Sequence, residues 1–457
     1  MNSAFKNITL TAVLLSFSAS AYANTGALKL LSERNDPAKA AELKDLVSSD
    51  SKSAITLLAE ALRTDKDPDY RCSAIEALAA SKDEAVAKKL AGLLDDSDSN
   101  VRACAIRSAG ESKNEFAVKS LLATVESYQK AVRSRRGPYE DNIKARLKAI
   151  DSIWSLGEIG TPALMSNLAK FYAEADDVIK MNLIISMGKL KKNGNSGPYL
   201  FDIAASAQET EVVRAVAFEM LEHIGYPSTV LNLTPSKNTG IEKGDLIYTG
   251  GIVGTIGSWG NPDLPIGHAG LFAGTEIKNG RINVIITDCV PNNFKPGGVR
   301  NIYSWYNFTH HYNYPYYGNR TTLAKPTAEQ RARIVKLGLE LGAKGLKYSN
   351  THFSQKGPVE FDCVGYVEYI YEQAGLNPTD NSYESGLGWP LTPWEQFEAT
   401  RPNTPKPGGI ILPNSGNIIV PNQAVITQGF RSLTGAFGMN DVQAPEVDTN
   451  IQPEAAN

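Results

Sequence analysis

Two side chains in the second half of the chain have the chemistry of a nucleophile and a base. Cys363 opens the segment 363–375, in which apolar residues recur at helical spacing until Gly375 ends the pattern. The thiol therefore lies in the first turn of an expected helix, where unpaired backbone amides and the helix dipole favour the thiolate. Because a thiolate attacks carbonyl carbon atoms, Cys363 is a candidate nucleophile. A buried structural cysteine is the alternative.

A thiol at neutral pH needs a base, and His268 is the best candidate. It lies in an apolar, glycine-containing run at 265–274 that reads as a strand. Alternation along this strand places Gly270 and Phe272 on the side that carries the histidine. Considered alone, a histidine in such a strand is more often a hydrogen-bonded structural residue than a base.

The residues around both side chains resemble the NlpC-type cysteine peptidase superfamily. The nucleophile of that family sits in an Asp-Cys-Ser-Gly-aromatic-Val motif that opens a helix, and residues 362–367 read Asp-Cys-Val-Gly-Tyr-Val. The family's histidine strand, Gly-His-x-Gly-Ile-Tyr-x-Gly, is similar to residues 267–274. The Gly-Asp-Leu-Val-Phe strand that precedes it is similar to residues 243–248. Val364 departs from the family's serine.

The order of the two motifs resembles a circularly permuted branch of that superfamily. His268 precedes Cys363 by 95 residues (363 − 268), whereas the cysteine usually comes first. The permuted branch includes YiiX-like bacterial proteins and the lecithin retinol acyltransferase group. A permutation keeps the site because catalysis depends on geometry rather than on chain order. The resemblance covers residues 241–400 and implies an α+β papain-like domain.

The resemblance also implies further site residues. YiiX-like proteins carry an acidic residue near the end of the strand that follows the histidine strand, which here is Asp288, and such a residue would orient the imidazole. A turn-forming Asp at a strand end is the alternative. Tyr348 is implied to hold the substrate amine, although the Trp-Gly-Gly that usually follows it is absent. The backbone amide of Cys363 is implied as the oxyanion donor. Cys289 should point to the face opposite Asp288, where it cannot form a disulfide with the nucleophile.

An aromatic stretch at 303–317 lies between the two motifs. Its rings could form a platform for sugar rings or acyl chains, or a packed insertion over the sheet, and the sequence leaves both open. His310 and His311 are adjacent, and adjacent side chains on an extended chain face opposite ways. We therefore expect no metal site, and we expect no cofactor.

The first half of the chain has a different pattern. Residues 36–230 are rich in Ala and Leu at helical spacing, and their motifs recur. Arg71 and Arg102 are 31 residues apart (102 − 71), as are Gly157 and Gly188 (188 − 157). A period near 30 with two helices per copy indicates a solenoid, and the pattern resembles short HEAT repeats. The concave surface of such a solenoid is a candidate site for a protein partner.

We therefore predict a multidomain chain in which an N-terminal all-α HEAT-like solenoid precedes an α+β papain-like domain of the permuted NlpC type. The boundaries are a signal peptide at 1–23, the repeat domain at 24–230, the hydrolase domain at 235–400 and an irregular Pro-, Asn- and Gly-rich tail at 401–457. We expect the repeats and the hydrolase domain to fold independently.

The chain's beginning and its charge limit where it acts and on what. Lys6, the apolar run 8–17 and the small-x-small site ending at Ala23 indicate an export signal, so we expect a periplasmic or secreted protein without a transmembrane segment. A net charge of −3 excludes nucleic acid as a natural partner. Cys72 and Cys104 are expected as two buried thiols, because packed helices lie about 8–10 Å apart and a disulfide needs closer backbones.

These observations favour a cysteine hydrolase of amide bonds that works through a Cys-His-Asp site and an acyl-enzyme. In the expected compartment, the stem peptides of peptidoglycan are the natural substrate. Two alternatives stay open: an ester or lipid acyl hydrolase or acyltransferase, and an inactive papain-like domain that only binds its partner.

Overall fold

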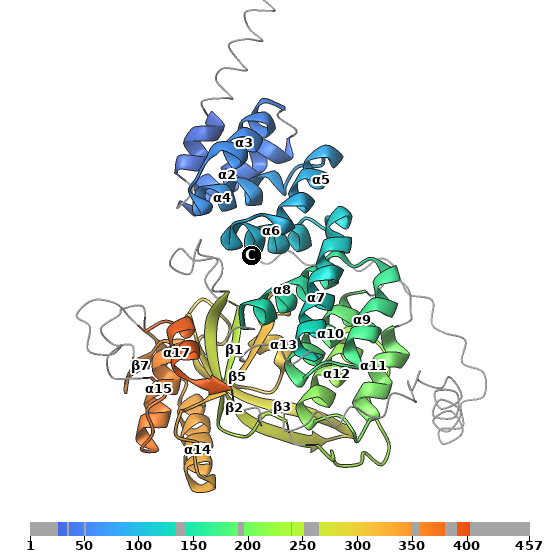
Figure 1. Ribbon diagram of the computed structural model, residues 1–457. Coiled ribbons are helices and arrows are strands. Elements are labelled where there is room, and N and C mark those ends of the chain that lie inside the picture. The colour runs from blue at the N-terminus through green and yellow to red at the C-terminus, as the bar shows by residue number, and fades with distance from the viewer. Residues whose placement is uncertain are drawn as a thin grey trace, which may run out of the picture. The chain divides into compact units, whose positions relative to one another are not determined.

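The structure is a computed structural model that describes residues 26–33, 36–49, 52–133, 143–190, 196–238, 240–250, 265–349, 356–379 and 391–402. Helices occupy the first half of the chain, and a sheet with its own helices follows (Figure 1). The helices are α2 (Pro37–Ser48), α3 (Lys52–Thr64), α4 (Pro68–Leu78), α5 (Glu84–Gly92), α6 (Ser99–Glu111), α7 (Val118–Arg133), α8 (Ile143–Ile159), α9 (Met165–Tyr172), α10 (Asp177–Lys189), α11 (Ser196–Ala205), α12 (Glu211–His223), α13 (Trp305–Phe308), α14 (Ala328–Lys344), α15 (Cys363–Gln373) and α17 (Pro393–Ala399). The strands are β1 (Asp245–Gly250), β2 (Ile266–Lys278), β3 (Arg281–Val290), β4 (Gly298–Ile302), β5 (Tyr316–Thr321), β6 (Lys347–Tyr348), β7 (Glu360–Phe361) and β8 (Arg401–Pro402).

The change from helices to strands falls where the sequence predicts it. The strands expected at 243–248 and 265–274, and the following one that carries Asp288, correspond to β1, β2 and β3. The expected export signal at 1–23 lies outside the described residues, as does the tail beyond Pro402. None of the described helices is long and apolar enough to cross a membrane.

Three of the second helices of the repeats follow an aspartate. Asp67, Asp98 and Asp176 each precede such a helix, and their carboxylates accept hydrogen bonds from backbone N–H groups of the first turn. Such caps satisfy helix donors that have no intrahelical partner. These second helices, α4, α6, α8, α10 and α12, pack against one another in succession.

Close packing between successive helices explains the recurring glycine. A Cβ atom on Gly157 would lie 2.7 Å from Oγ of Ser186, so only a glycine allows this approach. The Ser186 hydroxyl donates a hydrogen bond to the carbonyl of Ile153 at 2.8 Å. Gly110 and Ser155 repeat the arrangement one helix earlier.

The expectation of two free thiols in the repeats is wrong. Cys72 of α4 and Cys104 of α6 form a disulfide, with their Cα atoms 5.6 Å apart. The two helices pack against each other with both cysteines buried, and their backbones approach closely enough for the bridge. The bridge lies within the core of the first repeats.

One antiparallel sheet, in the order β4-β3-β2-β1-β5-β8, forms the second half of the described chain. Helices α14, α15 and α17 cover one face, on which Leu271 and Thr287 pack against Gly338 of α14. Helix α13 and the repeat helices α8, α10 and α12 contact the strands from the other side (Figure 1). Phe308 of α13 packs there directly on Gly270, where a Cβ atom would lie 2.7 Å from the ring.

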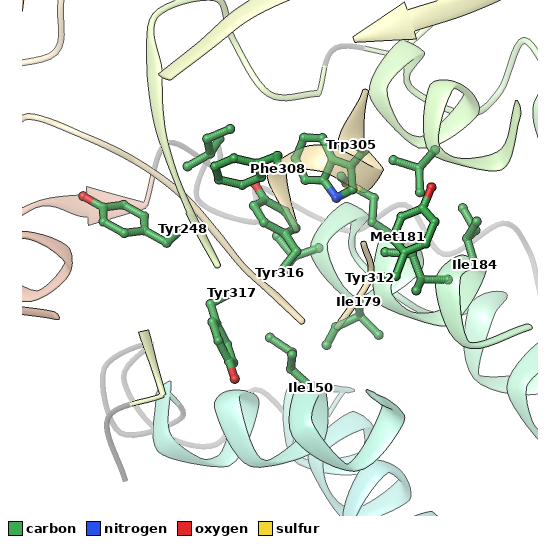
Figure 2. Packing of buried hydrophobic residues seen from close by; sticks show 14 of the residues in the cluster. Ile150, Ile179, Met181, Ile184, Tyr248, Trp305, Phe308, Tyr312, Tyr316 and Tyr317 are labelled. Carbon is green, nitrogen blue, oxygen red and sulfur yellow. The ribbon is translucent and has the colours of Figure 1, made fainter. Parts of the chain in front are cut away.

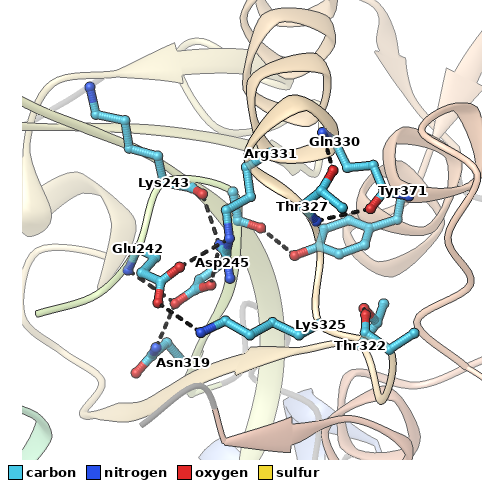
Figure 3. Close-up of polar contacts among 12 residues, drawn as sticks. Glu242, Lys243, Asp245, Asn319, Thr322, Lys325, Thr327, Gln330, Arg331 and Tyr371 are labelled. Carbon is cyan, nitrogen blue, oxygen red and sulfur yellow. Dashed lines mark hydrogen bonds and ion pairs between the residues drawn. The ribbon is translucent and has the colours of Figure 1, made fainter. Parts of the chain in front are cut away.

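A buried ion pair attaches α14 to the start of the sheet (Figure 3). Asp245, at the first position of β1, receives a hydrogen bond of 2.8 Å from the guanidinium of Arg331 and one of 2.7 Å from the amide of Asn319. Arg331 also donates to the carbonyl of Lys243 at 2.9 Å. The aspartate that the sequence singled out in residues 243–248 therefore joins β1, β5 and α14.

The repeats and the sheet share one hydrophobic core (Figure 2). Trp305, Phe308 and Tyr316 are fully buried between the sheet and the side chains of α8 and α10, which include Ile150 and Ile179. The aromatic stretch is therefore largely a packed insertion and not an exposed platform for sugar rings or acyl chains.

Buried hydrogen bonds reinforce this shared core. Asn182 of α10 makes two with the backbone of Tyr316, donating to its carbonyl at 2.7 Å and accepting from its N–H at 3.0 Å. The Tyr317 hydroxyl donates to Asp151 of α8 at 2.6 Å. Each would leave a buried polar group unpaired if the two halves separated. The packing therefore contradicts the expectation that the repeats and the hydrolase domain fold independently.

We predict that a fragment comprising residues 232–457 loses cooperative unfolding. Without α8, α10 and α12, the rings of Trp305, Tyr316 and Tyr317 become exposed and their buried hydrogen bonds are lost. Thermal melting of this fragment and of residues 24–457, together with their solubility, measures the effect. A soluble fragment that melts cooperatively would contradict the shared core.

A second prediction concerns Asp151, whose burial raises its pKa to about 6 despite Arg107 and the hydrogen bond from Tyr317. A raised folded-state pKa stabilises the fold below the unfolded value, and this stability is lost as the pH rises through about 6. Asp151→Asn keeps an oxygen acceptor for Tyr317. It should therefore stabilise the protein by about 3 kcal/mol at pH 7.5 and by only about 1 kcal/mol at pH 4.5.

Chemical denaturation at the two pH values measures this difference. The exposed Asp95→Asn is the matched control and should show no pH-dependent gain. An Asp151→Asn variant with equal gains at both pH values would exclude a buried charge as the cause.

Candidate active site

Cys363 is the first residue of α15, in the turn that the sequence predicts. Asp362 is the N-cap residue, and its carboxylate accepts a hydrogen bond from the N–H of Gly365 at 2.7 Å. This cap fixes the entry of the chain into the helix. The thiol retains 7% of its exposed surface.

The sulfur of Cys363 lies beside the strand that carries the histidine. The N–H groups of Ala269 in β2 and of Val364 in α15 donate hydrogen bonds to it. The ladder between β2 and β3 ends at the pair Gly270–Asp288, so Ala269 lies just beyond it. The Cys289 thiol donates to the carbonyl of Phe361 at 3.1 Å and holds the segment before α15 against β3.

Burial raises the pKa of the Cys363 thiol well above its usual value, and the charge of Asp362 raises it further. The hydrogen bonds from Ala269 and Val364 act in the opposite direction but are outweighed. The expectation that the helix start favours a thiolate is therefore wrong for this resting state. The free-energy penalty of removing the thiolate from water exceeds the stabilisation that the two amide hydrogen bonds give it. The group is a thiol that needs a base.

His268 and Asp288 meet on the neighbouring strands β2 and β3. Nε2 of the imidazole lies 2.9 Å from Oδ2 of the carboxylate, and both side chains are fully buried. The guanidinium of Arg300 in β4 donates two hydrogen bonds to the same carboxylate, with Nε 2.8 Å from Oδ1 and a terminal nitrogen 3.1 Å from Oδ2. Asp288 and Arg300 are cross-strand partners.

These contacts define the charge of Asp288. Burial alone would raise its pKa, but the positive charge of Arg300 and the hydrogen bonds from His268 and Arg300 hold the pKa far below its usual range. The carboxylate is therefore ionised and accepts a proton-bearing Nε2. In neutral imidazole this leaves Nδ1 as the acceptor, and Nδ1 has no hydrogen-bond partner among the described residues.

The thiol and the imidazole approach from opposite faces of the sheet. His268 shares the face of Gly270 and Phe308, whereas α15 covers the face of Thr287. The sulfur is connected to the histidine strand by the N–H of Ala269, the residue after His268, just beyond the last β2–β3 pair. No hydrogen bond joins the two groups in this structure.

Tyr348 also lies beside the thiol. Its strand β6 pairs in parallel with β7, with Tyr348 opposite Phe361. Burial and the neighbouring Cys363 raise the pKa of its phenol, so the side chain is a neutral hydrogen-bond donor. His268 is thus paired with Asp288, and Tyr348 lies beside Cys363, but no hydrogen bond joins the imidazole to the thiol.

Two residues near the site were not predicted from the sequence. Arg300 has no local signal, because only the register between β3 and β4 places it opposite Asp288. His310 lies in the aromatic stretch, and its ring centre is 5.3 Å from that of His268. Its backbone has a positive φ of 53°, so the assumption of an extended chain at 310–311 fails.

Comparison with known proteins concerns only the repeats. A family model described as HEAT repeats matches residues 55–136. Searches of curated proteins and of solved structures gave no match. The first half of the chain therefore contains HEAT-like repeats, followed by a region that contains the strands.

We predict that Arg300→Gln destabilises the protein by about 3–5 kcal/mol, because it leaves a buried carboxylate without its counter-charge. Urea unfolding of the single variants Arg300→Gln and Asp288→Asn and of the double variant measures the coupling. The double variant should lose less than the sum of the single losses. The exposed Arg333→Gln serves as the control, and additive losses would show that the pair is not coupled.

Proposed function

We propose that the protein is a cysteine hydrolase of the permuted NlpC type, with a papain-like domain that cleaves amide bonds in the periplasm or outside the cell. The observation that carries the proposal is the pair formed by His268 and ionised Asp288 beside the Cys363 sulfur. The open Nδ1 of His268 is the acceptor that a thiol requires. Peptidoglycan stem peptides are the substrate that fits this compartment.

In the proposed reaction, Nδ1 of His268 removes the proton of the Cys363 thiol while the sulfur attacks the carbonyl carbon. Asp288 holds the ring through Nε2 and stabilises the imidazolium that forms. The imidazolium then protonates the leaving amine, and a water molecule releases the acyl group by the reverse sequence. Because the thiol is protonated at rest, proton transfer accompanies the attack instead of preceding it.

The start of α15 provides donors for the developing oxyanion. The N–H of Cys363 belongs to the first turn, whose amides have no acceptor within the helix. Negative charge is favoured at this end of a helix. The phenol of Tyr348, which stays protonated, is suited to hold the substrate's polar group beside the sulfur.

We further propose that the repeats direct the enzyme to a protein partner or to its substrate. HEAT repeats often mediate protein interactions, and residues 55–136 match that family model. Helices α8, α10 and α12 are engaged with the chain's own sheet and α13. The earlier repeats, which carry the Cys72–Cys104 disulfide and have their own hydrophobic core, are therefore the part suited to a partner.

An inactive binding domain is the competing function, and two observations favour it. The thiol is almost fully buried with a raised pKa, and it has no hydrogen bond to His268. An ester or lipid acyl hydrolase would use the same nucleophile and base. Measurements of hydrolytic activity on amide and on ester or lipid substrates distinguish the amide hydrolase, the acyl hydrolase and the inactive binding domain.

We predict that Cys363→Ala abolishes turnover and that His268→Ala lowers kcat/KM by about 10²–10⁴-fold, the usual contribution of a positioned base. Asp288→Asn should cost less than either, since it leaves the base in place. Mass spectrometry of wall digests and lipid extracts incubated with each variant identifies the bond cleaved.

Thermal melting of each variant shows that the fold is retained. Equal product from wild type and Cys363→Ala would refute a cysteine mechanism. Release of fatty acids with unchanged wall digests would instead identify the acyl hydrolase.

A further inference from the structure

His310 is a second buried imidazole beside the proposed base. The two rings meet edge to face, with centres 5.3 Å apart. The rings of Phe294 and Tyr314 also pack against His310, with centre-to-centre distances of 5.3 and 5.7 Å. His310 retains 7% of its exposed surface, yet neither of its ring nitrogens has a hydrogen-bond partner among the described residues. Leaving a buried polar group unpaired costs about 1–3 kcal/mol, so such a group indicates a site for a polar ligand.

The backbone holds His310 in a strained conformation. His310, His311 and Tyr312 have φ angles of 53°, 64° and 60°, which is the left-handed region, at a cost of about 1–2 kcal/mol for each residue. Strain of this kind persists only where surrounding contacts impose it, and it clusters at functional sites.

A carboxylate from the repeats imposes this conformation. Glu219 of α12 accepts hydrogen bonds from the N–H groups of Trp305 and Tyr306 at 2.6 and 2.9 Å and from the hydroxyl of Tyr312 at 3.1 Å. The N–H of His311 donates to the carbonyl of Tyr306 at 2.7 Å, and the two rings stack. The turn that presents His310 is therefore held at both ends.

The position of His310 relative to His268 indicates which part of a substrate it meets. Both imidazoles lie on the α13 side of the sheet, whereas the sulfur of Cys363 reaches the site from α15. The base returns its proton to the leaving group, so a group beside the base is next to the leaving atom and not to the oxyanion. His310 is thus placed for the leaving side of the scissile bond.

We propose that His310 is a specificity-determining residue that accepts a hydrogen bond from the N–H of the leaving group and so favours amides over esters. An ester has an oxygen at this position and no hydrogen to donate. This inference rests on the proposed function and narrows it to amide substrates. Burial and the neighbouring His268 lower the pKa of His310 to about 3, so one ring nitrogen remains an acceptor at working pH.

The test compares two small probes that share an acyl group, acetyl-L-alanine p-nitroanilide and acetyl-L-alanine p-nitrophenyl ester. His310→Phe keeps a ring but loses the acceptor. It should lower kcat/KM for the anilide by about 10- to 100-fold, the range for a lost hydrogen bond in a buried site, and for the ester by less than about threefold. Tyr303→Phe, at an exposed position of the same aromatic stretch, should change neither value.

Asn tolerates the left-handed conformation and offers an amide oxygen, so His310→Asn should retain more anilide hydrolysis than His310→Phe. Iodoacetamide labelling of Cys363 should be unchanged in both variants, because the nucleophile and base stay in place. Equal losses on both probes, no loss on the anilide, or slowed labelling would overturn the role of His310. Turnover that is the same in wild type and Cys363→Ala would instead refute the hydrolase itself.

Discussion

A buried carboxylate, Glu219, connects the two halves of this chain. It lies on the last repeat helix, and it accepts hydrogen bonds from the backbone at Trp305 and Tyr306 and from the Tyr312 hydroxyl. A charge removed from water is tolerated only when several donors surround it. Those donors all come from the aromatic segment that packs over His268, so the repeats help to build the wall of the candidate site. The HEAT-like region therefore shares its core with the half that carries the sheet.

Within the candidate site, the charged side chains lie on β3 and β4, and the neutral thiol lies at the start of α15. Arg300 keeps Asp288 ionised, Asp288 fixes the tautomer of His268, and the imidazole presents one open nitrogen. The sulfur of Cys363 meets the opposite condition, since burial outweighs the amides that would stabilise its negative charge. Asp288 thus orients the imidazole as a fixed anion, while the Cys363 thiol stays neutral. Burial and a protonated state both lower the susceptibility of a thiol to oxidation, because reactivity follows thiolate character and exposure.

The helices and strands could be predicted from the sequence because they depend on short-range residue patterns. Helical periodicity and the 31-residue spacing predicted the repeats, and the strand motifs at 243–248 and 265–274 predicted β1 and β2. The disulfide between Cys72 and Cys104 was missed, since it depends on how closely two helices pack, which local sequence patterns do not give. The independence of the two halves was also misjudged. Amphipathic patterns show that a helix has a buried face but not which neighbour covers it.

For the site, the sequence by itself determined the residue types and their local setting: a cysteine at a helix start, a histidine in a strand, and an acidic residue on the next strand. Only the tertiary structure decided their partners. Arg300 acquires its place through the register between β3 and β4, and His310 through a left-handed turn held by Glu219 from another half of the chain. The thiol's charge state likewise depended on burial, because the cost of removing a charge from water is set by everything packed around it and not by its neighbours in sequence.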